Sequence, residues 1–166
     1  MTPVAQATGN GFLYTLAPSI TPSLTGTVSK VYDGNTTATL APANLTASGA
    51  VDGDTVVLAA ASATYDNRNV GTGKTVTATG ITATASNGTA AVYGYTVSPD
   101  SASGPVGEIT AAPLTVTSIA AVNTPYGTPA ATGAVTLSGV VVGDTVTSTA
   151  SLVGPTYATS GTLNAG

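Results

Sequence analysis

The chain repeats itself, and this self-similarity limits the folds that it can adopt. The run Val-Asp-Gly-Asp-Thr-Val at residues 51–56 returns as Val-Val-Gly-Asp-Thr-Val at residues 141–146. Tyr32 has a counterpart in Tyr126, which preserves the order of the landmarks at a spacing of about ninety residues. A repeat of this length predicts copies of one structural unit in series rather than a single large core.

A third fragment of the same unit stands near the start of the chain. Leu-Tyr-Thr-Leu-Ala-Pro at residues 13–18 is similar to Gly-Tyr-Thr-Val-Ser-Pro at residues 94–99. We therefore expect residues 1–22 to be the tail of a preceding repeat and residues 23–112 to form one complete β repeat. Residues 113–166 are then part of the next repeat, so the second unit is expected to be incomplete.

The composition favours an all-β fold. Hydrophobic residues make up 42% of the chain, and they are mostly small or β-branched, with one Phe, one Met and no Trp. Such residues suit the half-buried faces of β-sheets, whereas long straight-chain helix formers are scarce. The apolar content is also too high for a disordered chain.

Charge and residue types exclude several functions. Lys30, Arg68 and Lys74 are the only basic residues and the net charge is −4, so no basic surface for nucleic acid or an anionic membrane can form. No run approaches the roughly twenty apolar residues of a membrane span. Without His or Cys, zinc sites, thiol chemistry and His-dependent triads are impossible. We predict no enzyme activity and no cofactor.

Alternating patterns and glycine-containing turns predict short strands. Residues 75–79 place Val76 and Ala78 on one face and three Thr on the other, and residues 114–117 alternate in the same way. Turn formers lie at residues 33–35, 52–54, 71–73 and 87–88. Strands at this spacing predict a β-sandwich.

Tyr32, Tyr65 and Tyr95 are the candidate aromatic residues of the complete unit. They could form a platform that stacks on sugars, or they could fill a core otherwise built of small residues, with each hydroxyl bound to a loop carbonyl. We favour the core role, because the chain is poor in other large apolar residues.

Four carboxylates are the weak candidates for metal ligands: Asp33, Asp52, Asp54 and Asp66. Calcium needs six to eight converging oxygens, and the sequence lacks the calcium-loop pattern with its terminal Glu. We favour the alternative that Asp33 and Asp54 bind backbone N–H groups in turns, with Lys30 or Arg68 as a partner. We predict no metal site.

An ordered set of motifs points to a family. Tyr-Asp-Gly at residues 32–34 is followed by Gly-Asp at 53–54, Tyr-Asp-Asn at 65–67 and Tyr-Thr at 95–96, and this set resembles the YDG repeat of filamentous-haemagglutinin-type bacterial adhesins. From residue 109, Ile-Thr-Ala-Ala-Pro-Leu-Thr-Val-Thr resembles the related MBG repeat, a bacterial Ig-like module. The motif residues are Tyr32, Asp33, Gly34, Gly53, Asp54, Tyr65 and Tyr95.

The resemblance implies tandem Ig-like β-sandwich repeats in an extracellular bacterial protein of cell adhesion and biofilms. The leading hypothesis is a structural stalk that holds a distal binding domain away from the outer membrane. The alternative is a module that binds a glycan or another ligand. The expected partners are neighbouring repeats of the same polypeptide and a second copy added head to tail, with no nucleic acid and no direct membrane insertion.

Overall fold

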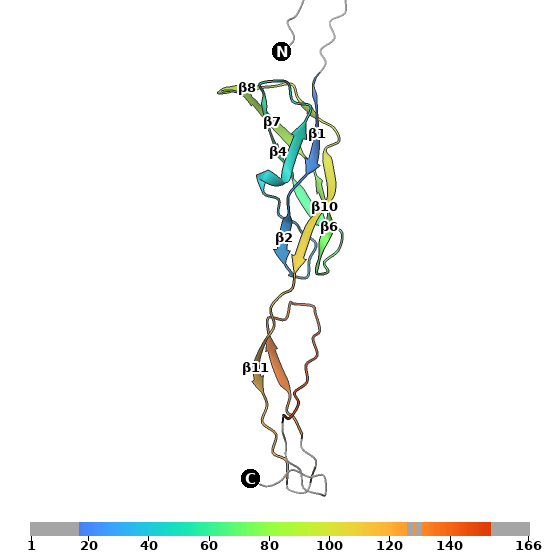
Figure 1. Cartoon of the computed structure of the whole chain (residues 1–166), viewed down its shortest axis with the longest axis vertical. Helices are drawn as coiled ribbons and strands as arrows, with labels where there is room; N and C mark the ends of the chain where they lie inside the picture. Colours follow the sequence, from blue (N-terminus) through green and yellow to red (C-terminus); the bar gives the residue numbers. More distant parts are fainter. Residues whose placement is uncertain (1–16, 126–127, 129–130, 154–166) are drawn as a thin grey trace, which may run out of the picture. The chain divides into compact units, whose positions relative to one another are not determined.

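The computed structural model describes residues 17–125, 128 and 131–153, and within them it is all-β, as the composition predicts (Figure 1). Among these residues no helix has the length and apolar character that crossing a membrane requires. The elements are β1 (Ser19–Leu24), β2 (Val28–Val31), the 3-10 turn η1 (Pro42–Asn44), β3 (Leu45–Ser48), β4 (Thr55–Ala59), β5 (Ser62–Tyr65), β6 (Gly71–Thr79), β7 (Thr82–Asn87), β8 (Ala90–Val92), β9 (Thr96–Val97), β10 (Ser101–Thr110), β11 (Thr115–Ile119) and β12 (Val135–Ser138).

The chain divides into two compact units. Unit 1 takes in the described residues up to Val28 together with Thr37–Asp66 and Thr72–Glu108. Unit 2 takes in Ser29–Thr36, Asn67–Gly71 and the described residues from Ile109 onward. The predicted boundary after residue 22 falls inside β1, and the one after residue 112 falls in the link between β10 and β11.

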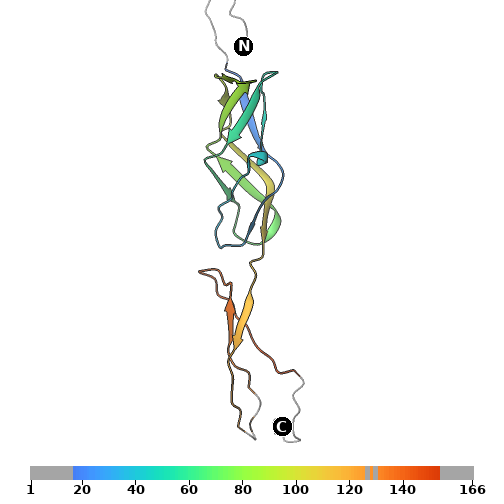
Figure 2. The ribbon, with the colours of Figure 1, turned by 90° about the vertical axis from the view of Figure 1, so that its left-hand side faces the viewer.

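The strands pair into four sheets, with the orders β3-β1-β9, β2-β10-β6-β5, β4-β7-β8 and β11-β12. Strand β1 is central in the first sheet, because β3 pairs with it antiparallel and β9 pairs with it parallel. The hairpin of β11 and β12 is the orange pair of strands in Figure 2. The all-β prediction is thus confirmed, and the Ig-like sandwich architecture of the repeats stays a prediction.

The core of unit 1 follows the period-two pattern of its strands. In β6, Lys74, Val76 and Ala78 are buried and the intervening Thr side chains point outward, as the alternation at residues 75–79 predicts for Val76 and Ala78. Tyr65 on β5 packs over Gly107 on β10, where a Cβ would lie 2.9 Å from the ring. Only glycine leaves room for the ring at this position.

The structure contains the same antiparallel strand pair twice. In β1–β3, Thr21 pairs with Ser48, and in β11–β12, Thr115 pairs with Ser138. After each second strand comes a glycine whose Cβ would lie 2.3 Å from a carbonyl oxygen, Gly49 against Ser19 and Gly139 against Pro113. The glycines have φ values of 92° and 87°. The internal repeat of the sequence is therefore also a repeat of local structure.

The turn that follows each strand pair is also repeated. The Asp54 N–H donates to the Val51 carbonyl at 3.0 Å, and the Asp144 N–H donates to the Val141 carbonyl at 3.0 Å. Gly53 and Gly143 both take a positive φ, which explains why both copies need glycine there.

Two other turn predictions had different outcomes. Gly88 has a φ of 58° and closes the β7–β8 hairpin, as the Asn-Gly sequence predicts. The turn predicted at residues 71–73 is wrong, because these residues begin β6. Gly73 does take a φ of 64°, so the conformational signal of the glycine is present, but the strand continues through it.

Candidate functional site

Asp54 is the centre of a hydrogen-bonded cluster in unit 1, which we call the Asp54 lock. The Tyr95 hydroxyl donates to Oδ2 of Asp54 at 2.6 Å, and Nδ2 of Asn87 donates to Oδ1 at 3.0 Å. The Val51 N–H in turn donates to the Tyr95 hydroxyl at 2.8 Å. The lock ties the turn before β4 to the end of β7 and to the residue before β9.

The electrostatics of the lock follow from these bonds. The Tyr95 hydroxyl, followed by the Asn87 amide, stabilises the carboxylate and lowers the pKa of Asp54 below its ordinary value. The same bond raises the pKa of Tyr95, because the neighbouring carboxylate disfavours a tyrosinate. Asp54 was expected to bind backbone N–H groups. Instead its carboxylate receives two side-chain donors, whereas its own N–H closes the turn.

The loop that carries Tyr-Asp-Gly is braced by Lys30. Its Nζ donates to Oδ1 of Asp33 at 2.7 Å, and to the carbonyl and Oδ1 of Asn35 at 2.8 and 2.9 Å. The Asn35 N–H also donates to Asp33 at 3.1 Å. Lys30 first, and the Asn35 N–H second, lower the pKa of Asp33. This agrees with the predicted role of Asp33 as a turn-binding carboxylate with Lys30 as its partner.

Among the described tyrosines of unit 1, Tyr65 is the buried one. Its side chain is almost fully enclosed, and its hydroxyl donates to the Val28 carbonyl at 2.8 Å. This is the contact predicted for a core tyrosine.

Within unit 2, a second carboxylate contacts the Tyr-Asp-Gly loop. Oδ1 of Asp144 lies 3.6 Å from Nη1 of Arg68, on the loop Asn67–Gly71. Asp144 also accepts a hydrogen bond from Tyr32, and this bond is the main reason that the pKa of Tyr32 is raised.

A scan against protein-family models matches residues 16–102 to the YDG domain, which is more than half of the chain. The chain belongs to the YDG domain family. A search of curated proteins and a search of solved structures each found no significant match.

The YDG domain holds its three motif tyrosines in different environments. Tyr65 is buried, whereas Tyr32 and Tyr95 are half-buried with their hydroxyls bound to carboxylates. The predicted core role therefore fits Tyr65 best. At the other two, carboxylates take the place of the expected loop carbonyls, and a charged acceptor makes the stronger hydrogen bond. Two repeat counterparts lie outside the described residues: Tyr126, the counterpart of Tyr32, and Tyr157, which follows Pro-Thr as Tyr65 follows Ala-Thr and is the counterpart of Tyr65.

The YDG domain does not bring the four candidate metal ligands together. Asp33 and Asp54 are bound as above, Asp66 pairs with Lys74 at 3.0 Å, and Asp52 is exposed. In the described part of the chain, no three His, Cys, Asp or Glu side chains form a group that could hold a metal ion.

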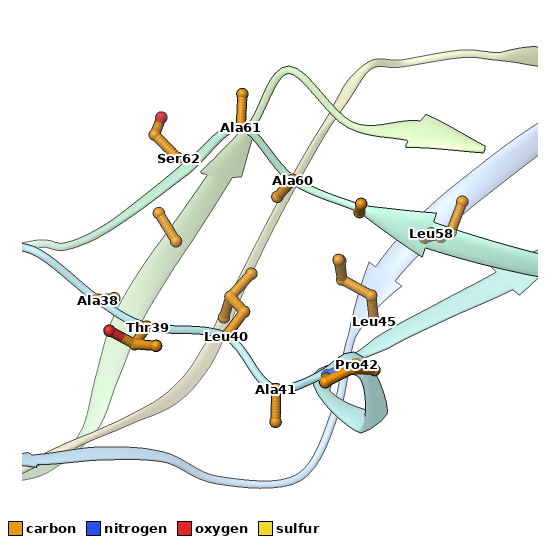
Figure 3. A pocket seen from close by; sticks show the side chains of 12 residues that line it. Ala38, Thr39, Leu40, Ala41, Pro42, Leu45, Leu58, Ala60, Ala61 and Ser62 are labelled. Carbon is orange, nitrogen blue, oxygen red and sulfur yellow. The ribbon is translucent and has the colours of Figure 1, made fainter. Parts of the chain in front are cut away.

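A shallow pocket of about 320 Å³ lies between the segments 38–45 and 58–63 of the YDG domain (Figure 3). Its walls are mostly Ala and Leu side chains, including Leu40, Leu45 and Leu58, and no aromatic or charged residue lines it. A sugar-binding site needs converging polar groups and a stacking ring, so this lining does not fit one.

The sequence analysis missed two buried polar residues of the YDG domain. Asn44 joins η1 to the segment after β1, because its Nδ2 donates to the Thr25 carbonyl at 3.0 Å and its Oδ1 accepts from the Ala41 N–H at 2.9 Å. Lys74, with 7% of its side chain exposed, reaches the more exposed Asp66. Lys74 lies two residues before Val76, so the alternation at residues 75–79, extended by one residue, places it on the buried face.

Proposed function

We propose that the chain is a stalk segment of a bacterial cell-surface adhesin of filamentous-haemagglutinin type. In this proposal a YDG repeat is followed by an MBG-like repeat, both of them Ig-like β-sandwiches, and the array acts mechanically and without catalysis. It spaces a distal binding domain from the outer membrane, in an extracellular setting. Head-to-tail association with a second copy is part of the proposal.

The repeated strand pair and turn carry this proposal. A stalk is made by using one unit many times, and the chain builds the same strand pairing, the same close-approach glycine and the same Asp turn twice. The uses of the polar motif residues also support it. The hydrogen bonds of these residues, namely Asp33, Asp54 and Tyr95, are made to neighbouring parts of the same chain. This suits a spacer better than a module that must present polar groups to a ligand.

Segment exchange in the parent adhesin tests the proposal. Replacing the YDG repeat with an unrelated β domain of similar length should preserve adhesion of the bacteria, whereas deleting it without replacement should reduce adhesion. Antibodies against the chain should label intact cells. Loss of adhesion after the replacement would instead favour the ligand-binding alternative, and labelling only after permeabilisation would contradict the surface location.

A further inference from the structure

We propose that the Tyr32-Asp33-Gly34 motif is the seat for the Gly143-Asp144 turn of the segment that follows the YDG domain. The inference deepens the proposed stalk role: it rests on that role for its biological purpose, and on the contacts within unit 2 for its geometry. It assigns a separate task to each residue of the motif.

Gly34 provides the space in the seat. A Cβ at this position would lie 3.0 Å from Cγ1 of Val141, so any side chain would push against the incoming turn. Gly34 also has a φ of 80°, which other residues rarely adopt. The loop conformation therefore favours glycine, and the incoming segment packs tightly against the same position.

Tyr32 and Arg68 provide the polar contacts. The Tyr32 hydroxyl binds the Asp144 carboxylate, and the Arg68 guanidinium lies 3.6 Å from the same carboxylate. Asp144 is only 21% exposed, so its charge is partly withdrawn from water and gains from two donors.

Asp33 holds the seat in shape. It binds Lys30 and the Asn35 N–H, and it makes no contact with Asp144 that the structure records. On the other side of Tyr32, the Tyr32 N–H donates to the Thr110 carbonyl at 2.8 Å. Tyr32 is thus fixed to the end of β10, from which the following segment leads.

The first copy of the turn has other partners, so the contacts with Tyr32 and Arg68 are specific to the second copy. Asp54 has the same turn geometry as Asp144, but Tyr95 and Asn87 of its own unit bind its carboxylate. In both copies, therefore, a tyrosine hydroxyl binds the aspartate of the turn. For Asp144, that tyrosine is Tyr32 of the YDG motif.

Titration of the tyrosines by NMR in the full chain, with 13C at Cζ, tests the seat. Asp144→Asn removes the hydrogen-bonding anion and should lower the pKa of Tyr32. Arg68→Ala removes a positive charge that lowers the pKa of Tyr32, so this variant should raise that pKa. Asp33 is the other charged group near the hydroxyl, and it is unchanged in both variants. Asp54→Asn is the matched control, since it should lower the pKa of Tyr95 and leave Tyr32 unchanged.

A second measurement does not depend on charge. The Val141 methyl groups should show a nuclear Overhauser contact with Gly34, and Gly34→Ala should shift the Val141 methyl signals. Gly88→Ala is the matched control, because Gly88 has a similar φ of 58° but no neighbour within 4 Å of a Cβ. An unchanged Tyr32 titration in Asp144→Asn, or no contact between Val141 and Gly34, would overturn the seat. Neither result depends on where the parent protein is located or on its adhesion.

Discussion

Strands β1 and β11 have matching antiparallel partners and very different surroundings. Each pairs antiparallel with a strand that ends before a close-packed glycine. Ile20 on β1 is fully buried, whereas Leu114, at the corresponding position beside its glycine, is 47% exposed. Strand β1 also has β9 on its other side, whereas among the described residues β11 pairs with β12 alone.

This difference separates local from distant causes of structure. The strand pairing and the Asp turn form in both copies, so they depend on the segment of each repeat that runs from the first strand to the turn. Burial depends on strands that arrive much later, such as β6, β9 and β10 in unit 1. Breaking the distant contacts should therefore affect β1 and its neighbours far more than β11.

The largest expected effect comes from Tyr65. Tyr65→Ala removes a buried ring and the bond to the Val28 carbonyl, and it should lower the free energy of unfolding by about 3–5 kcal/mol in urea denaturation. Tyr93→Ala is the matched control, because Tyr93 is 89% exposed and its loss should change stability by less than about 0.5 kcal/mol. Equal effects of the two substitutions would refute the core role of Tyr65.

A matched pair tests the comparison of the strands directly. Ile20→Ala should cost about 2–5 kcal/mol, because the side chain is fully buried, and Leu114→Ala should cost less than Ile20→Ala in proportion to its exposure. Urea denaturation followed by NMR signals of each strand gives both values. If Leu114→Ala were as costly as Ile20→Ala, the surroundings of β11 would have to be as closely packed as those of β1.

The sequence predicts the local features of this molecule well and the distant ones poorly. Glycine at residues 53, 88 and 143 indicates positive φ because the preference belongs to the residue itself. The alternation around Val76 indicates the buried face of the strand, because successive side chains of a strand point to opposite faces. Tyr95 and Asp54 lie 41 residues apart, and nothing in either neighbourhood reveals that they meet. The same alternation places Lys74 on the buried face, but its partner Asp66 lies on the loop after β5 and cannot be read from the pattern.

A smaller effect is expected from the Asp54 lock. Tyr95→Phe removes the main donor to Asp54 and should return the pKa of that carboxyl toward 3.8. Because the folded protein lowers this pKa, the stabilisation is complete above pH 3.8 and is lost as the pH falls through the lowered value. Urea denaturation should therefore show Tyr95→Phe to be less stable than the unmodified chain at neutral pH, with a difference that shrinks in acid. A difference that does not depend on pH would mean that the hydroxyl stabilises the fold through the bond from the Val51 N–H and not through the Asp54 carboxylate.

The smallest expected effect is self-association at the outer edge of β11. In unit 1 the corresponding edge of β1 is covered by β9, through bonds from the Thr96 N–H to the Pro18 carbonyl at 3.0 Å and from the Ser98 N–H to the Ile20 carbonyl at 2.9 Å. A strand from a second copy that repeats this pairing gains only a few main-chain hydrogen bonds, each worth about 1 kcal/mol, so the association should be weak and head to tail.

The strand that a second copy adds to β11 could come from residues 12–20, because their sequence resembles the segment with β9, which covers β1. Only part of this segment is a candidate. Its last residues, Ser19 and Ile20, belong to β1, and residues 12–16 lie outside the described part of the chain. Light scattering over a range of concentrations should show a slow rise in average mass, and Val116→Lys should suppress it, because a charge on an open strand discourages pairing. Thr64→Lys on β5 is the matched control on another strand of the chain. A chain that stays monomeric at the highest concentration would exclude strand addition, and would imply that the edge of β11 is covered within the same molecule or left to water.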